Sequence, residues 1–162
     1  MLRAGALPVL LRLIAADNMM VIEVATMVLA LLCIEWEAKL DAIKLNAIPL
    51  LVNLLEKKCK VTTRTAAAAA LMHISVEISG KAKAVEAGIV HALAASLDED
   101  EDKLLVYCLQ CIANIGESKA ARNLLRSLAL QIAELQNHNQ EVVQRSAMLA
   151  LRAVDFEVVG RQ

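Results

Sequence analysis

Two cysteines three positions apart, Cys108 and Cys111, form the motif of the chain that is most suited to a chemical role. A C-x-x-C motif serves in thiol redox chemistry or as one half of a zinc site, and a zinc site needs a second pair of Cys or His at ligand spacing. The sequence has no such second pair. Both cysteines lie within a helical pattern at positions that suit small apolar side chains, so we interpret them as core residues, which a zinc content measurement would test.

Other catalytic groups are scattered. The three histidines, His73, His91 and His138, lie far apart, and the sequence shows no nucleophile elbow and no Gly-rich phosphate loop. Carboxylates gather in one run only, which we expect to be an exposed loop at the start of a helix and a possible electrostatic contact for a basic partner: Asp98, Glu99, Asp100, Glu101 and Asp102. The sequence therefore predicts a protein without enzyme activity, cofactor, metal or small-molecule substrate.

The amino-acid composition further limits the fold class and the kinds of partner to be expected. The chain of 162 residues is 58% hydrophobic but only 2% aromatic, with five Gly and two Pro, which favours packed helices over sheets. Its 17 basic and 18 acidic residues provide no basic surface for nucleic acid or for an anionic membrane. The apolar stretch from Met19 to Ile34 is interrupted by Glu23 and is too short to cross a bilayer. We expect reduced cysteines, a cytoplasmic location and protein partners.

Two series of similar segments repeat along the chain with a period near 40 residues. The first series is marked by Leu7, Ile48, Ile89 and Leu128, and the second by Leu31, Leu71, Ile112 and Leu151. Such a period in a helical composition indicates an all-α, right-handed α-solenoid of about four armadillo- or HEAT-type repeats in a single domain, residues 1–162. The repeats are expected at about 1–35, 36–78, 79–117 and 118–156, with 157–162 as a tail.

Each repeat is expected to hold a short helix, a Gly or Asn bend, a second helix opened by Pro or its equivalent, and a longer third helix. The bend of the first repeat would fall at Ala4-Gly5, directly after Met1-Leu2-Arg3. The third helices are predicted near 18–34, 61–76, 103–116 and 140–156. The second-series residues Leu31, Leu71, Ile112 and Leu151 should be buried.

The runs Asn46-Ala47-Ile48-Pro49 and Glu86-Ala87-Gly88-Ile89, together with the Ala-Leu-x-x-Ile signature, resemble the armadillo family. The run from Ala70 to Lys81, with Ala121-Arg122-Asn123-Leu124-Leu125 and Val143-Gln144-Arg145-Ser146-Ala147, is similar to the armadillo-type proteins of radial spokes. This resemblance implies a structural subunit of the axoneme of cilia and flagella, a cytoskeletal location, and other radial spoke subunits as partners. A free adaptor for exchangeable peptides is the alternative.

The resemblance also implies a concave groove along the third helices, where armadillo proteins hold peptides with a ladder of Trp and Asn. At the Asn position this chain has Cys33, His73, Asn114 and Ala153, so only Asn114 is retained. The third repeat continues as a polar stripe, whereas the first has an apolar one of Ile22, Thr26, Leu29 and Cys33. The groove residues predicted to bind a partner are His73, Lys103, Tyr107, Gln110 and Asn114.

The amino-terminal end offers a second candidate contact. The first repeat lacks its first helix, so apolar residues that would pack against that helix are expected to have no cover within this chain. We expect them to contact preceding chain or another subunit: Leu2, Leu7, Leu10, Leu11 and Ile14.

Overall fold

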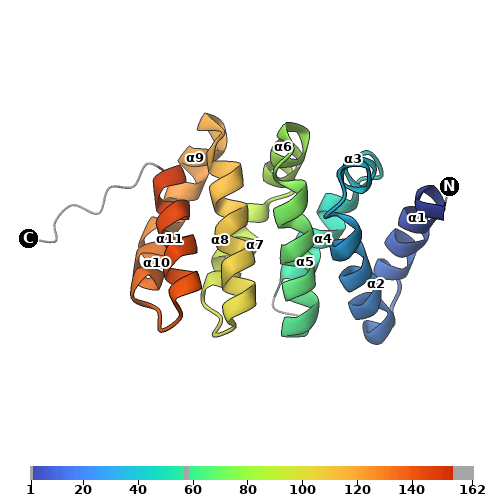
Figure 1. Ribbon diagram of the computed structural model, residues 1–162, viewed down its shortest axis with the longest axis horizontal. Helices are drawn as coiled ribbons and strands as arrows, with labels where there is room; N and C mark the ends of the chain where they lie inside the picture. Colours follow the sequence, from blue (N-terminus) through green and yellow to red (C-terminus); the bar gives the residue numbers. More distant parts are fainter. Residues whose placement is uncertain (1, 57–58, 155–162) are drawn as a thin grey trace, which may run out of the picture.

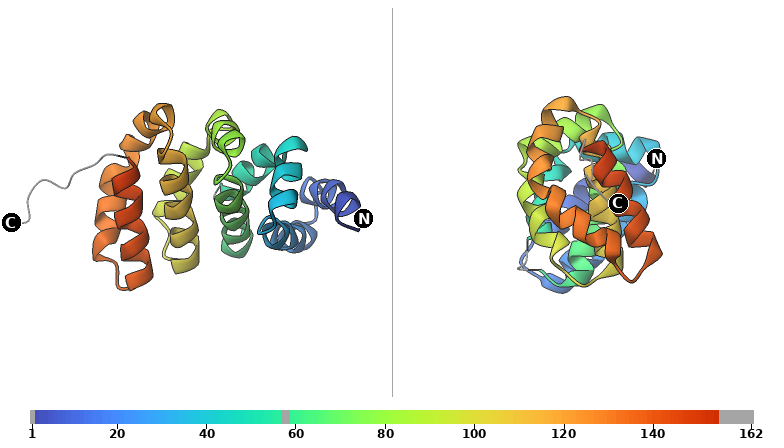
Figure 2. Two further views of the ribbon diagram at one scale, coloured as in Figure 1. Left: turned by 45° about the horizontal axis from the view of Figure 1, so that its top comes forward. Right: turned by 90° about the vertical axis from the view of Figure 1, so that its left-hand side faces the viewer.

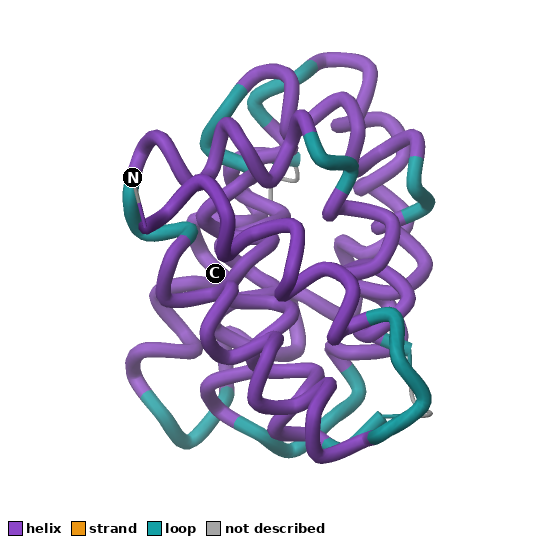
Figure 3. The backbone as a smooth tube through the Cα atoms, turned by 90° about the vertical axis from the view of Figure 1, so that its right-hand side faces the viewer, coloured by secondary structure: helices purple, strands orange, loops and turns teal. Residues whose placement is uncertain are grey.

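The computed structural model describes residues 2–56 and 59–154, with side chains from Gly5 onward. Within these residues every regular element is a helix, as the tube in Figure 3 shows. Helix α1 (Leu2–Ile14) and α2 (Met19–Leu32) form the first repeat. The second repeat holds α3 (Trp36–Lys44), α4 (Ala47–Leu55) and α5 (Val61–Ile74), and the third holds α6 (Ile78–Glu86), α7 (Ile89–Leu97) and α8 (Asp102–Gly116).

The last repeat has more broken helices. It contains α9 (Lys119–Leu125), α10 (Ala129–Glu134) and α11 (Glu141–Ala153), with 3-10 turns at Arg126–Leu128 and Leu135–Asn137. The four long helices α2, α5, α8 and α11 stand side by side in one row, with α4, α7 and α10 behind them and α3, α6 and α9 across one edge (Figures 1 and 2). The predicted α-solenoid is therefore confirmed.

The bends between the first two helices of a repeat depend on left-handed backbone. Asn46 (φ 59°) precedes α4 and Gly88 (φ 79°) precedes α7, as the Asn or Gly of the predicted bend requires. Pro49 lies in the first turn of α4, where its missing N–H costs no helical hydrogen bond. The bend predicted at Ala4-Gly5 is wrong, because α1 runs without a break through Gly5 and Pro8. The strong helix formers around Gly5 continue the helix.

The register of the first repeat also differs from the prediction. The buried residues of α2 recur 41 positions later on α5, so that Ala30 (8% exposed) is the equivalent of Leu71 (1% exposed). Leu31, predicted to be buried, is 67% exposed, whereas Leu71, Ile112 and Leu151 are buried as predicted. Our alignment of the second series was therefore one residue out of register between the first and second repeats.

Candidate functional site: the concave groove

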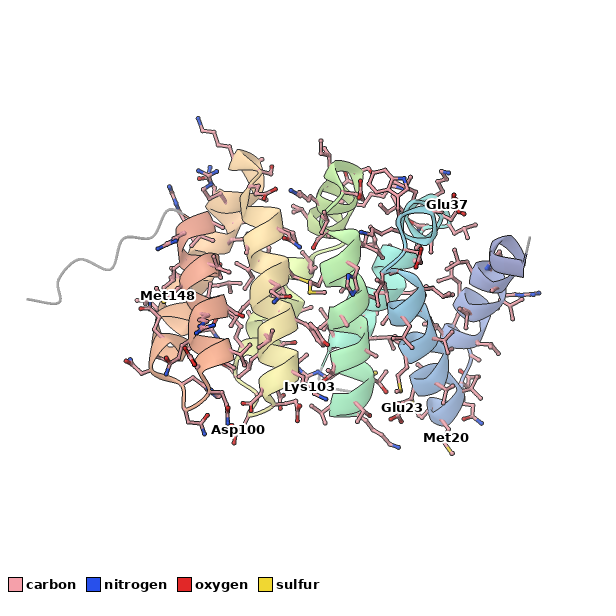
Figure 4. The ribbon with its side chains drawn as sticks, in the orientation of Figure 1. Met20, Glu23, Glu37, Asp100, Lys103 and Met148 are labelled. Carbon is pink, nitrogen blue, oxygen red and sulfur yellow. The ribbon has the colours of Figure 1, made fainter. Side chains whose placement is uncertain are left out.

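An open groove with a volume of about 600 Å³ runs across the row of long helices, between α2, α5 and the start of α8. Half of its lining residues are apolar and half are polar. The apolar ones are Met27, Ala30, Leu31, Val61, Ala66 and Ala69, and the polar ones are Glu23, Thr62, Thr65, Glu101, Lys103 and Tyr107. We call this set the concave groove. Glu23 and Lys103 lie at the same end of their helices in Figure 4.

The acidic side chain of the groove on α2 is held by the next helix. Thr62 donates a hydrogen bond to Glu23 over 2.6 Å, and Lys60 forms an ion pair with the same carboxylate at 3.5 Å. The hydrogen bond from Thr62 lowers the pKa of Glu23; desolvation opposes this shift, and the charge of Lys60 adds to it, so the carboxylate is charged at neutral pH. These contacts join α2 to the start of α5 at one end of the groove.

The structure brings two of the five predicted groove residues into the groove. Lys103 and Tyr107 line it, whereas His73, Gln110 and Asn114 lie half-buried outside its lining. Asn114 donates hydrogen bonds to the carbonyl oxygen of Met72 and to the hydroxyl of Ser75, both over 3.1 Å, so its amide joins α8 to α5. Burial, and then the charge of Lys39, lowers the pKa of His73, which is therefore neutral at pH 7.

Sequence reasoning missed the first-repeat wall of the groove. The residues assigned to that wall, Ile22, Thr26, Leu29 and Cys33, are buried core residues, which is a consequence of the one-residue error in register. The actual wall is formed by Glu23, Met27, Ala30 and Leu31. The sequence did hold the information needed to place this wall. Leu7 and Ile48 are 41 residues apart, and an alignment of the first two long helices at the same offset assigns the wall residues correctly.

The acidic run is partly engaged inside the protein. Glu99 accepts a hydrogen bond of 2.8 Å from the buried guanidinium of Arg64, and Asp98 accepts one of 2.9 Å from Gln131. Glu101 lines the concave groove, and Asp102 lies 3.8 Å from His138. The expectation of an exposed loop of five carboxylates is therefore wrong for Glu99, Glu101 and Asp102, which are half-buried. The side chain of Glu99 is 31% exposed and paired.

Arg64 joins three segments. Besides its contact with Glu99, it donates to the carbonyl oxygen of Leu55 over 2.9 Å and to the hydroxyl of Ser96 over 3.2 Å. Leu55 ends α4 and its carbonyl has no helical partner, so Arg64 supplies the missing donor. The guanidinium therefore links the first turn of α5 to the carboxyl ends of α4 and α7.

The amino-terminal residues are largely covered by the chain itself. Leu7, Leu11 and Ile14 are buried, and Leu10 is half-buried. The expectation that they have no cover is wrong for these three, because α1 packs against α2 and α3. The side chain of Leu2 lies outside the described residues. The apolar side chains that α1 exposes are instead Val9 and Leu13.

The cysteines behave as apolar core residues. Cys33, Cys108 and Cys111 are buried with free thiols, and burial raises the pKa of Cys33 and of Cys108 to about 12 and that of Cys111 well above its usual value. In the part of the chain that the structure describes, no group of three or more Cys, His, Asp or Glu is arranged to hold a metal ion. The described helices also include none that is both long and apolar enough to span a bilayer.

The arrangement of the helices is similar to that in several solved structures. A designed armadillo repeat protein in complex with the peptide (KR)4 has a TM-score of 0.84 and 26% sequence identity, and the match covers 94% of this chain and 66% of that one. The chain has the armadillo-repeat fold. A computationally designed armadillo repeat protein for modular peptide recognition has a TM-score of 0.85 at 27% identity, over 94% of this chain and 66% of the other.

An engineered protein matches equally well, with a TM-score of 0.85 and 27% identity over 93% of this chain and 64% of its own length. This chain therefore spans slightly less than two thirds of the structures that it resembles. No family model and no curated protein matches the sequence.

Proposed function

We propose that this protein is a non-enzymatic scaffold that binds a segment of another protein in the concave groove. The observation that carries the proposal is the composition of the groove, whose lining across three repeats is half apolar and half polar. A partner can hydrogen-bond to the polar residues while an aliphatic side chain packs against the apolar ones. One designed armadillo protein of the same fold is described as made for modular peptide recognition and another is in complex with the peptide (KR)4, which supports peptide binding by this fold.

The chemistry of the groove favours one fixed partner over exchangeable basic peptides. The Trp/Asn ladder is missing, and the one retained Asn, Asn114, donates its amide hydrogens to α5 within the fold. The groove is lined by Lys103 as well as by Glu23 and Glu101, so it has no uniform negative charge for a Lys/Arg-rich ligand. An exchangeable adaptor remains the second candidate, favoured by the exposed Lys103 and the half-buried Tyr107 on α8.

We further propose the finer role of a radial spoke component of the ciliary or flagellar axoneme. The support for this role is the sequence resemblance of the segments 70–81, 121–125 and 143–147 to a radial spoke head protein of the armadillo type. The test is expression of the tagged chain in motile ciliated cells, followed by detergent extraction. A radial spoke component stays with the axoneme and is lost from axonemes without spokes, whereas a soluble adaptor is released by detergent in both.

Binding in the concave groove is tested with one matched pair of variants, once co-purification has identified the partner. Leu31→Glu places a charge on the groove wall, at a side chain that is 67% exposed, and should abolish binding. Leu124→Glu changes a similarly exposed leucine (53%) on α9, outside the groove, and should bind normally. Equal binding by both variants would show that the partner uses another face.

A further inference from the structure

The side-chain hydrogen-bond donors of the concave groove are unevenly distributed. Two of them are already used within the protein, because the hydroxyls of Thr62 and Thr65 donate to Glu23 and to a backbone carbonyl of α5, over 2.6 Å and 2.8 Å. In the part of the chain that the structure describes, Lys103 and Tyr107 are the lining side chains that can donate and make no hydrogen bond or ion pair. Both stand on α8, so the α2 and α5 sides of the groove offer a partner no free side-chain donor.

This distribution bears on the backbone conformation of the partner. An extended segment brings unpaired carbonyl oxygens into the groove, and each one buried beside α2 and α5 without a donor costs about 1–3 kcal/mol. A helix pairs its carbonyl oxygens with its own N–H groups, so it can cover the same surface through side chains alone. The α2 and α5 sides of the groove therefore favour a helical partner over an extended one.

The apolar residues of the groove also have the shape of a helix-packing surface. On α2, Met27 and Leu31 are 50% and 67% exposed and lie one turn apart, so they form a ridge along that helix. On α5, which packs beside α2 in Figure 1, the lining residues Ala66 and Ala69 are small and lie three positions apart. Side chains of another helix can pack between such a ridge and such small residues, since these allow a close approach.

The length of this surface fits a short helix. The lining residues of α5 extend from Val61 to Ala69, which corresponds to about 12 Å along the helix axis or a little over two turns. A partner helix of about three turns lying along α2 and α5 covers this length and reaches the first turns of α8, where Lys103 and Tyr107 stand.

The exposed charge in the lining of the groove is positive. Lys103 is exposed, whereas Glu23 and Glu101 are half-buried and Glu23 is already paired. Lys103 stands in the first turn of α8, where the helix macrodipole disfavours a cation, and the carboxylate of the same turn, Asp102, lies 3.8 Å from His138. A carboxylate of the partner is therefore the group that complements the α8 end of the groove.

We propose that the segment bound in the concave groove is an amphipathic helix of about three turns. Its aliphatic side chains pack between the ridge of Met27 and Leu31 on α2 and the alanines Ala66 and Ala69 on α5, and an acidic side chain pairs with Lys103. This inference rests on the proposed function, because it specifies the form of the partner that the same groove binds.

The experiment selects binders on the purified chain from a displayed library of random peptides, each long enough for about four helical turns. We expect the enriched peptides to have apolar residues at spacings of three and four with an acidic residue beside them, and to gain helical circular dichroism in the complex. Replacing a central residue of such a peptide by Pro should weaken binding at least about tenfold more than replacing it by Ala.

Three variants of the chain locate the contact. Leu31→Glu should weaken binding by about tenfold or more, and Lys103→Glu should weaken the acidic peptides by about threefold or more. Leu124→Glu changes a leucine that is 53% exposed on α9, outside the groove, and should leave binding unchanged.

The failure of this inference differs from the failure of the proposed function. If no peptide is enriched, or if Leu31→Glu binds the enriched peptides as well as Leu124→Glu does, the groove is not the binding site and both fail. If binding depends on Leu31 but the peptides gain no helix or tolerate the central Pro, the proposed function stands and the helical partner is overturned. Enrichment of basic peptides, or equal affinity of Lys103→Glu for the acidic ones, overturns the assigned charge.

Discussion

Glu99 and Asp100 are neighbours in the acidic run, yet the structure predicts very different consequences of replacing them. Glu99 accepts a hydrogen bond of 2.8 Å from Arg64, whose side chain is 4% exposed, whereas Asp100 is exposed. Glu99→Ala therefore leaves a buried cation without its counter-charge. Asp100→Ala removes only a solvated carboxylate.

The magnitude follows from the burial of the pair. Removing one partner of a buried ion pair costs about 3–5 kcal/mol. Glu99 itself retains 31% of its side-chain exposure, so water can enter the vacated place and reach Arg64. We therefore expect a cost at or below the bottom of this range, about 2–3 kcal/mol for Glu99→Ala. Asp100→Ala should change the free energy of unfolding by less than about 0.5 kcal/mol.

The assay is urea unfolding of the wild type, both single variants, Arg64→Leu and the double variant Arg64→Leu/Glu99→Ala, followed by circular dichroism. If Glu99 acts through Arg64, its replacement should cost little once Arg64 is absent. Equal effects of Glu99→Ala and Asp100→Ala, or an undiminished effect of Glu99→Ala in the double variant, would refute this reasoning.

Three further predictions concern packing and pH. Gly80→Ala should destabilise the protein by about 2 kcal/mol or more, because the added Cβ would lie 2.2 Å from a carbonyl oxygen at the end of α5. Gly5→Ala should instead stabilise α1 by about 0.5–1 kcal/mol, because no atom lies within 4 Å of the added Cβ, and thermal melts of the two variants test both signs. Leu71→Asp should lower the free energy of unfolding by about 4 kcal/mol or more because Leu71 is 1% exposed, and Leu31→Asp should lower it by less than about 1 kcal/mol because Leu31 is 67% exposed. Equal losses in urea unfolding would show that Leu31 is buried like Leu71, as the sequence alignment predicted. Burial raises the pKa of Cys33 from 9.0 to about 12, so the thiol is protonated in both states below pH 9, and between pH 9 and 12 it ionises only in the unfolded state. The free energy of unfolding should therefore fall as pH rises from 9 toward 12, by about 1 kcal/mol per pH unit for this thiol. Urea titrations at several pH values test this, because Cys33→Ala should make the fall less steep.

The chemical groups of the concave groove could be predicted only in part from the sequence. Lys103 and Tyr107 were placed in it by continuing the stripe of the family's Asn and Trp positions along the third helix of the third repeat, and both line the groove. The role of Asn114 could not be predicted. Its acceptors on Met72 and Ser75 belong to another helix about 40 residues earlier, and their distance from the amide depends on how closely α5 and α8 pack.

Arg64 shows the same limit more strongly. In the sequence it is one basic residue within an alanine-rich helix, and an arginine is normally expected on the surface. Its burial becomes favourable only when Leu55 at the end of α4, and Ser96 and Glu99 at the end of α7, surround its guanidinium. That arrangement depends on the stacking of the second and third repeats.

The sequence by itself determined the helical class, the period, the bends at Asn46 and Gly88 and the approximate helix bounds, because each depends on local propensity or on spacing along the chain. Only the tertiary structure decided which side of α2 faces the core. That helix is apolar nearly all round, so Leu31 and Ala30 fit a buried position equally well by residue type. The small Ala30 is buried against its neighbours and the larger Leu31 is left on the groove wall, since close packing of helices selects by volume and shape as well as by hydrophobicity.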